Sequence, residues 1–195
     1  MLKKDVEKII QDWKRQQGLR LYTPYKYFKG LETKQLILEK LKEMQKWKNE
    51  NDVSKIQFKT DKSVTSVKKS PYHIAFEKQY GIPSSASMKQ KSTVSGVPES
   101  MLNTVFGKGV AAWKTGHRPG TTAVQWGNSR VDSFLVLGCT AFSGDASLLH
   151  ELYEKYLSKK TKKLDRFFSQ KPACPQYKLE RYKKRSNFPS FLKNI

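Results

Sequence analysis

The positive charge of this chain is concentrated at its two ends, which limits where a compact core can form. Residues 1–80 contain 19 basic and 10 acidic side chains, residues 81–153 contain 6 and 4, and residues 154–195 contain 13 and 3. A nearly neutral centre therefore lies between two basic flanks. Because charged side chains are seldom buried without partners, the sequence predicts a compact centre with basic extensions on both sides.

The overall charge indicates which kinds of partner the chain attracts. A net charge of +21 over 195 residues favours binding to nucleic acid, anionic membrane or acidic protein surfaces. No stretch approaches the roughly 18 apolar residues of a membrane span, and the first ten residues lack the apolar run of a secretory signal. We expect Cys139 and Cys174 to be free thiols of a reduced interior, with a disulfide as the alternative.

Apolar side chains recur at helical spacing in several segments. Val6, Ile10 and Trp13 share one face of a helix predicted over 3–17 and ended by Gly18. The same pattern predicts further helices, and they cover approximately residues 32–48, 72–80, 85–95, 98–106, 110–114, 121–138 and 145–157. We expect Gly107 to end the helix that begins at Pro98, and a short strand within 55–60.

These elements predict a mainly α fold: a small helical central domain with extended basic arms at both ends. The expected divisions are a basic helical extension over 1–48, a linker over 49–69, the central helical domain over 70–157, and a basic aromatic arm over 158–195. The last segment lacks periodicity, so we expect it to be extended. Trp113 and Trp126 are expected in the central core.

The segment 85–107 is similar in pattern to a helix-turn-helix. Ser92 is small, Gly96 lies at the turn, and Val97, Leu102 and Val105 could pin the second helix. The exposed side would present Asn103 and Thr104 beside Glu99 and Ser100. Lys91 occupies a usually apolar position and the second helix lacks cations over 98–106, so a purely structural helix pair remains the alternative.

Several cations are candidates for contacting a partner. In the loop Gly116–Gly120, Arg118 could donate to a phosphate or an acidic group, or could pair with a nearby carboxylate of this chain. The central candidates are Lys114, His117, Arg118 and Arg130. Those of the arm are Lys159, Lys160, Lys162, Lys163, Lys183, Lys184 and Arg185. Such cations can neutralise phosphates, although a solvated tail has the same composition.

The sequence contains no pattern typical of an enzyme. His73, His117, His150 and the two cysteines lack the spacing of a metal site. The pair Gly107 and Gly109 lacks the strand and the third glycine of a dinucleotide loop. We therefore predict no catalytic residues, no metal, no cofactor and no small-molecule substrate.

A block from Gly109 to Val131, GVAAWKTGHRPGTTAVQWGNSRV, resembles an uncharacterised family of nucleocytoplasmic large DNA viruses (chloroviruses and their relatives) and some phages. The similarity extends over about residues 20–140 and includes Ser70–His73 and Gly96–Pro98. It implies a viral source but no functional residues, because the family has no established chemistry.

Together these observations favour a non-enzymatic virion protein, namely a minor capsid or inner-virion component. It would be found in the capsid or its interior, and in the host cytoplasm or nucleus during assembly. Its basic arms would bind other capsid proteins or the packaged genome. The alternative is a DNA-binding protein that acts through the helix pair at 85–107.

Overall fold

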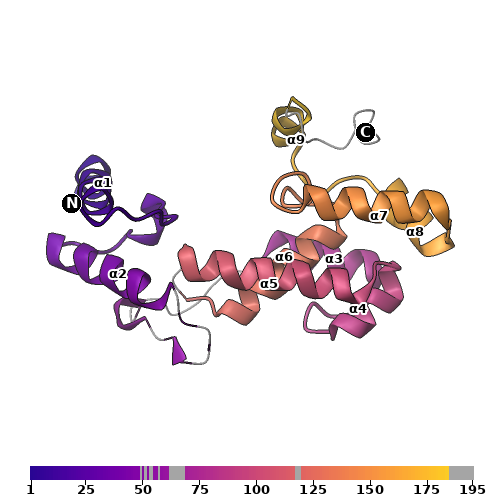
Figure 1. Ribbon diagram of the computed structural model, residues 1–195, viewed down its shortest axis with the longest axis horizontal. Helices are drawn as coiled ribbons and strands as arrows, with labels where there is room; N and C mark the ends of the chain where they lie inside the picture. Colours follow the sequence, from indigo (N-terminus) through magenta and orange to yellow (C-terminus); the bar gives the residue numbers. More distant parts are fainter. Residues whose placement is uncertain are drawn as a thin grey trace. The chain divides into compact units, whose positions relative to one another are not determined.

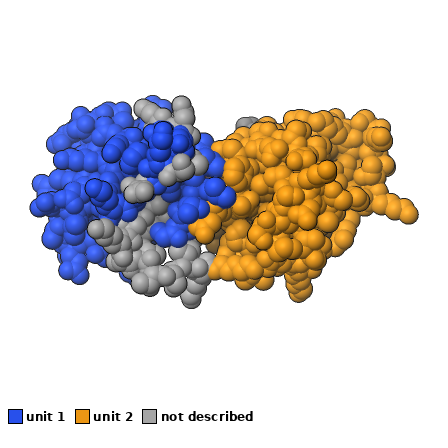
Figure 2. All heavy atoms as spheres, turned by 90° about the horizontal axis from the view of Figure 1, so that it is seen from below, with its two compact units in different colours: residues 1–68, 110–124 blue, residues 69–109, 125–195 orange. Residues whose placement is uncertain are grey.

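The computed structural model describes residues 1–48, 50, 52, 55–56, 58–61, 69–116 and 120–184. These residues form helices and connecting segments, with no strand among them, so the predicted mainly α fold is confirmed (Figure 1). The chain separates into two compact units (Figure 2). Unit 1 consists of Met1–Lys68 with Val110–Val124, and unit 2 of Lys69–Gly109 with Gln125–Ile195.

Unit 1 has a core of its own. Helices α1 (Lys3–Gln17) and α2 (Lys34–Trp47) pack against each other and follow the predicted bounds within two residues. Their buried apolar residues lie at helical spacing and are Val6, Ile10, Trp13, Ile37, Leu41 and Met44. The N-terminal segment is thus part of a compact unit and not an extended arm, because both helices bury their apolar faces.

Unit 1 also contains two short 3-10 helices, η1 (Tyr25–Tyr27) and η3 (Lys59–Asp61). η3 overlaps the segment where a strand was expected, so that expectation is wrong for its described residues. Trp113 is buried in this unit, where its indole N–H donates to the carbonyl of Thr121 at 2.8 Å. Trp126 is only half-buried, so neither tryptophan lies in the main core of unit 2.

Unit 2 contains the larger core. Its helices are α3 (Pro71–Tyr80), α4 (Met88–Ser95), α7 (Ala146–Ser158), α8 (Lys162–Ser169) and α9 (Gln176–Lys183), with parts of α5 (Glu99–Thr115) and α6 (Ala123–Leu135). The core is formed by side chains from all of these helices. Its fully buried members include Phe76, Leu102, Val105, Val131, Phe134, Leu149, Leu152 and Phe167.

Helix α5 continues through Gly107 and Gly109, so the break expected at Gly107 is wrong. Gly109 lies where α5 meets α6: a Cβ built on it would be 2.7 Å from the Cα of Gly127 and 3.2 Å from the carbonyl oxygen of Trp126. A Cβ on Gly127 would be 2.6 Å from the ring of Phe106. Gly109 and Gly127 thus let the two helices approach closely. In the sequence, a glycine of this kind looks the same as a glycine that ends a helix.

This close approach predicts opposite effects for two substitutions in α5. Gly109→Ala should lower the free energy of unfolding by about 1–3 kcal/mol, because backbone atoms of α6 occupy the space that the methyl group needs. Gly107→Ala should raise it by roughly 0.5–1 kcal/mol through helix propensity, because nothing lies within 4 Å of its Cβ position. Urea denaturation of both variants tests this; a stabilising Gly109→Ala would contradict the packing.

The C-terminal segment differs from the extended arm that the sequence predicts. Between Lys162 and Lys183 it forms α8 and α9, and Leu164, Phe167 and Leu179 are buried in the core of unit 2. Thr161 caps α8 by accepting a hydrogen bond from the N–H of Leu164 at 3.3 Å. Each helix has only eight residues and one or two apolar anchors, too few to produce a visible period.

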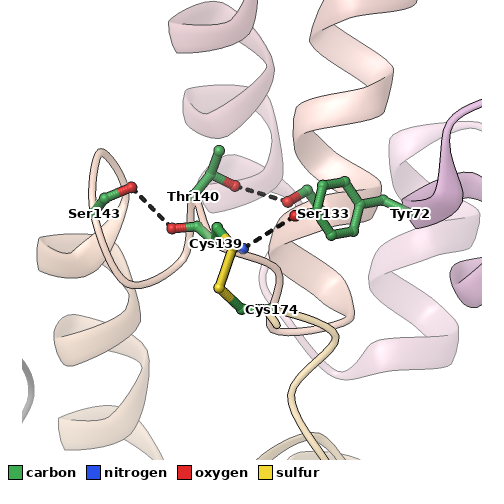
Figure 3. Close-up of a disulfide and its surroundings, with 6 residues drawn as sticks. All are labelled: Tyr72, Ser133, Cys139, Thr140, Ser143 and Cys174. Carbon is green, nitrogen blue, oxygen red and sulfur yellow. Dashed lines mark hydrogen bonds between the residues drawn. A yellow bond between two sulfur atoms is a disulfide. The ribbon is translucent and has the colours of Figure 1, made fainter. Parts of the chain in front are cut away.

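Cys139 and Cys174 form a disulfide, so the expectation of two free thiols is wrong. Figure 3 shows the bond with the polar groups around Cys139: its N–H points to the hydroxyl of Tyr72, and its carbonyl accepts from Ser143 at 2.8 Å. Two backbone hydrogen bonds, from the N–H of Ala173 to Val136 and from that of Cys174 to Leu137, accompany the bond. The segment before α9 is therefore attached to the loop after α6.

Candidate nucleic-acid interface

The predicted pair of helices with a glycine turn is present in unit 2. Ser87 caps α4 and forms a reciprocal pair of hydrogen bonds with Gln90. Gly96 ends α4 at a φ of 77°, a left-handed conformation that favours glycine. Val97, Leu102 and Val105 are completely buried. The helix-turn-helix-like unit expected at 85–107 is therefore formed, with a second helix that extends to Thr115.

The outward side of the first two turns of α5 is polar, and Glu99 is its only charged residue. Asn103 and Thr104 are exposed, as are Glu99 and Ser100. The hydroxyl of Thr104 donates to the carbonyl of Ser100 at 3.0 Å, whereas the side chain of Asn103 has no hydrogen-bond partner among the described residues. This side of the helix could contact base edges, but it offers no cation for phosphates.

Lys91, the unusual residue of α4, is explained by an ion pair in the interior. Its ammonium group is 2.6 Å from Oδ1 of Asp132, and both side chains have 0% exposure. The other oxygen of Asp132 lies 2.5 Å from Nδ1 of His73, which is 17% exposed. Lys91 also lies over the ring of Phe76, 5.1 Å from its centroid. Its charge is therefore paired inside the core and is not available to a partner.

Free lysines lie beside the turn of the helix pair instead. The first turn of α8 packs against Gly96: a Cβ there would be 2.8 Å from Cβ of Lys163, whose ammonium donates to the carbonyl of Thr93 at 2.6 Å. Lys159, Lys160 and Lys162 are exposed and have no partner among the described residues. We call these three lysines the α8 lysine cluster. The cluster is far from the helix pair in the sequence, and it comes near only because α8 packs against α4.

The only carboxylate of α8 does not neutralise this cluster. Asp165 accepts a hydrogen bond from the hydroxyl of Tyr156 at 2.6 Å. That hydrogen bond raises the pKa of Tyr156, because loss of its proton would place a second negative charge beside Asp165. Asp165 thus has a neutral donor as its hydrogen-bond partner and forms no ion pair with the three lysines among the described residues.

The central cations that the sequence singles out are in different situations. Arg130 holds Asp145 with two hydrogen bonds of 2.9 Å, and Lys108 lies 3.7 Å from the same carboxylate. Arg130 thus pairs with a carboxylate of its own chain, the kind of pairing that was considered for Arg118. Lys114 is half-exposed and belongs to unit 1. His117 and Arg118 lie outside the described residues.

The remaining candidates of the arm lie on or next to α9. Lys183 pairs with Glu180 at 3.0 Å, and Lys184 is exposed. Arg185 lies outside the described residues. Two further exposed cations, Lys171 and Arg181, have no described partner and were not singled out. In the sequence these two residues look like any other cation of a basic segment, so the sequence does not indicate which cations are paired and which are free.

Two other classes of site are not seen in the described ranges. No three His, Cys, Asp or Glu side chains gather there as metal ligands would. None of the helices in this part of the chain has both the length and the apolar character needed to cross a membrane.

The model of one protein family, described as a family of unknown function (DUF5824), matches residues 24–148. Comparisons with curated proteins and with solved structures give no match. The matched range includes the helix pair α4–α5 and ends within α7, so the α8 lysine cluster and α9 lie outside it.

Proposed function

The chain belongs to DUF5824, a family of unknown function, and we propose that it is a non-enzymatic virion protein that binds the packaged genome through the phosphate backbone. The observation behind this proposal is the α8 lysine cluster: three exposed lysines with no partner among the described residues, next in the chain to Lys163, which contacts the turn of the helix pair. The virion setting rests on the resemblance of the block Gly109–Val131.

The position of the cluster favours a phosphate backbone as the partner. Lys159, Lys160 and Lys162 flank the N-terminal end of α8, where the helix dipole adds a positive partial charge. Three like charges at that end are unfavourable for the isolated protein, and a bound polyanion would relieve the repulsion while releasing counterions. An acidic surface of a capsid protein offers similar charge but not the regular spacing of phosphates.

A second candidate function is base reading by α5. It is favoured by the exposed, unpaired side chain of Asn103, since asparagine can form two hydrogen bonds with adenine in the major groove. The α8 lysine cluster would then supply the phosphate contacts that α5 lacks. Asn103 lies about 6 Å along the helix axis from the first residue of α5, on the end nearer to Gly96.

A salt series with charge-matched variants tests the proposal. Replacing Lys159, Lys160 and Lys162 with glutamine in the full chain should weaken binding to duplex DNA. It should also reduce the slope of log Kobs against log salt by roughly 2 to 3, because about 0.9 counterion is released per phosphate contact. The control replaces three exposed, unpartnered lysines of unit 1, Lys4, Lys8 and Lys42, with glutamine, and should change the slope far less.

Three outcomes would be informative. Equal losses from both triple variants would mean that net charge alone attracts DNA, and the α8 lysine cluster would not be a site. Unchanged binding by the first variant would reject the proposal and direct the search to acidic protein partners. A preference among duplex sequences that persists at about 0.15 M salt and is lost with Asn103→Ala would favour base reading by α5.

A further inference from the structure

Helix α9 has one buried face and one exposed face. Leu179 is 2% exposed and belongs to the core of unit 2, and Tyr182 packs against that core. Tyr177, Arg181 and Lys184 follow at i, i+4 and i+7, a spacing that places them on one side of a helix, opposite Leu179. All three residues are exposed, and Tyr177 is 67% exposed.

One acidic residue, Glu180, lies beside this exposed row, at i+3 from Tyr177. Glu180, the only acidic residue of α9, accepts from the amide of Gln176 at 2.7 Å and pairs with Lys183 at 3.0 Å. Its carboxylate is therefore already paired with a lysine that is not part of the row. Lys178 adds a cation 5.8 Å from the ring centroid of Tyr177. The ring of Tyr177 is 67% exposed among three cations, Lys178, Arg181 and Lys184, so it offers a stacking face together with positive charge.

The row is fixed to the core and does not belong to a loose tail. The disulfide between Cys139 and Cys174 lies immediately before α9, together with the backbone hydrogen bonds of Ala173 and Cys174 to the loop after α6. Leu179 holds the helix from its buried side. The ring and the cations therefore keep a defined spacing, with Arg181 about 6 Å and Lys184 about 10 Å along the helix axis from Tyr177.

We propose that the exposed row of α9 binds single-stranded nucleic acid, with one base stacked on Tyr177 and the adjacent phosphates held by Arg181 and Lys184. This inference rests on the proposed function and extends it, since it names unpaired bases as a ligand that the α8 lysine cluster does not recognise. Stacking on aromatic rings accepts any base, and cations beside the ring follow the backbone. A duplex presents no free base face, so it uses only the charges.

The test is binding of the full chain to a short fluorescein-labelled oligothymidylate, followed by anisotropy. Tyr177→Ala should weaken binding roughly 5- to 100-fold, the loss of one stacked base, while Tyr177→Phe should bind like the wild type. Tyr177→Leu should bind like Tyr177→Ala, because it keeps an apolar side chain but has no ring. Affinity for duplex DNA should change less than about 3-fold in all three variants, since Tyr177 contributes no charge to phosphate binding.

Each result separates this inference from the proposed function. If oligothymidylate binding is the same in Tyr177→Ala as in the wild type while duplex binding still depends on the α8 lysine cluster, the stacking site is rejected and the proposed function stands. If Tyr177→Leu binds as well as Tyr177→Phe, the contact is hydrophobic and the inference is also wrong. If the wild-type chain binds neither ligand, both proposals fail.

Discussion

Replacing Asp132 with alanine should lower the free energy of unfolding by about 3–5 kcal/mol, the usual effect of removing one partner of a buried ion pair. Lys91 has 0% exposure, and Asp132 is the carboxylate within 2.6 Å of its ammonium group. Without Asp132 the ammonium would remain in the core, where its loss of hydration is not compensated. Urea denaturation followed by circular dichroism would measure the effect.

A double substitution distinguishes the lost ion pair from a general defect in packing. Lys91→Met combined with Asp132→Leu removes both charges, and buried ion pairs replaced by apolar side chains are often neutral or stabilising by about 1–4 kcal/mol. The double variant should therefore be more stable than Asp132→Ala. If Asp132→Ala costs less than about 1 kcal/mol, or the double variant is the least stable, Lys91 does not depend on this carboxylate.

Reduction of the disulfide should lower the free energy of unfolding by about 4 kcal/mol, from the entropy of a closed loop of this length. Cys139 and Cys174 are separated by 35 positions, and the bond closes a loop that contains α7 and α8. We also expect the amides of α9 to exchange with deuterium before those of α3 and α6, because the remaining anchors of α9 are few. Urea denaturation with and without a dithiol, and hydrogen exchange, would measure both effects.

The variant Cys139→Ala with Cys174→Ala is the control, since a dithiol should leave its stability unchanged. Under non-reducing conditions an alkylating agent should add nothing to the wild type, and after reduction it should modify both cysteines. Modification of both cysteines without reduction would show free thiols, the state that the sequence first suggested. Protection of the α9 amides that persists after reduction would show that the disulfide does not hold this helix.

The fold could be predicted from the sequence where local rules decide the structure. The helix at 3–17 and its end at Gly18 follow from periodicity and a glycine in the left-handed region. Gly107 led to an error because a glycine that ends a helix and a glycine inside one look the same in the sequence. The helices α8 and α9 were missed because their stability comes from the few side chains that they bury against distant residues.

The candidate site was predictable only in part. Asn103 and Thr104 were expected on the exposed side of the second helix, where the structure has them. Arg130 and Lys162 look equally available in the sequence, yet one holds Asp145 and the other has no described partner. The difference lies in where carboxylates are placed by the fold, which local sequence does not indicate.

The amino-acid sequence by itself determined that most segments before residue 158 are helical, where several of them begin or end, and that the flanks are basic, because periodicity, capping and charge are local properties. Only the tertiary structure decided what individual residues do. Lys91 meets Asp132 across 41 positions, Lys163 meets Thr93 across 70, and Cys139 meets Cys174 across 35. Burial and pairing depend on such distant neighbours. Only the tertiary structure therefore distinguishes a lysine of the core from a lysine that is free to bind a partner.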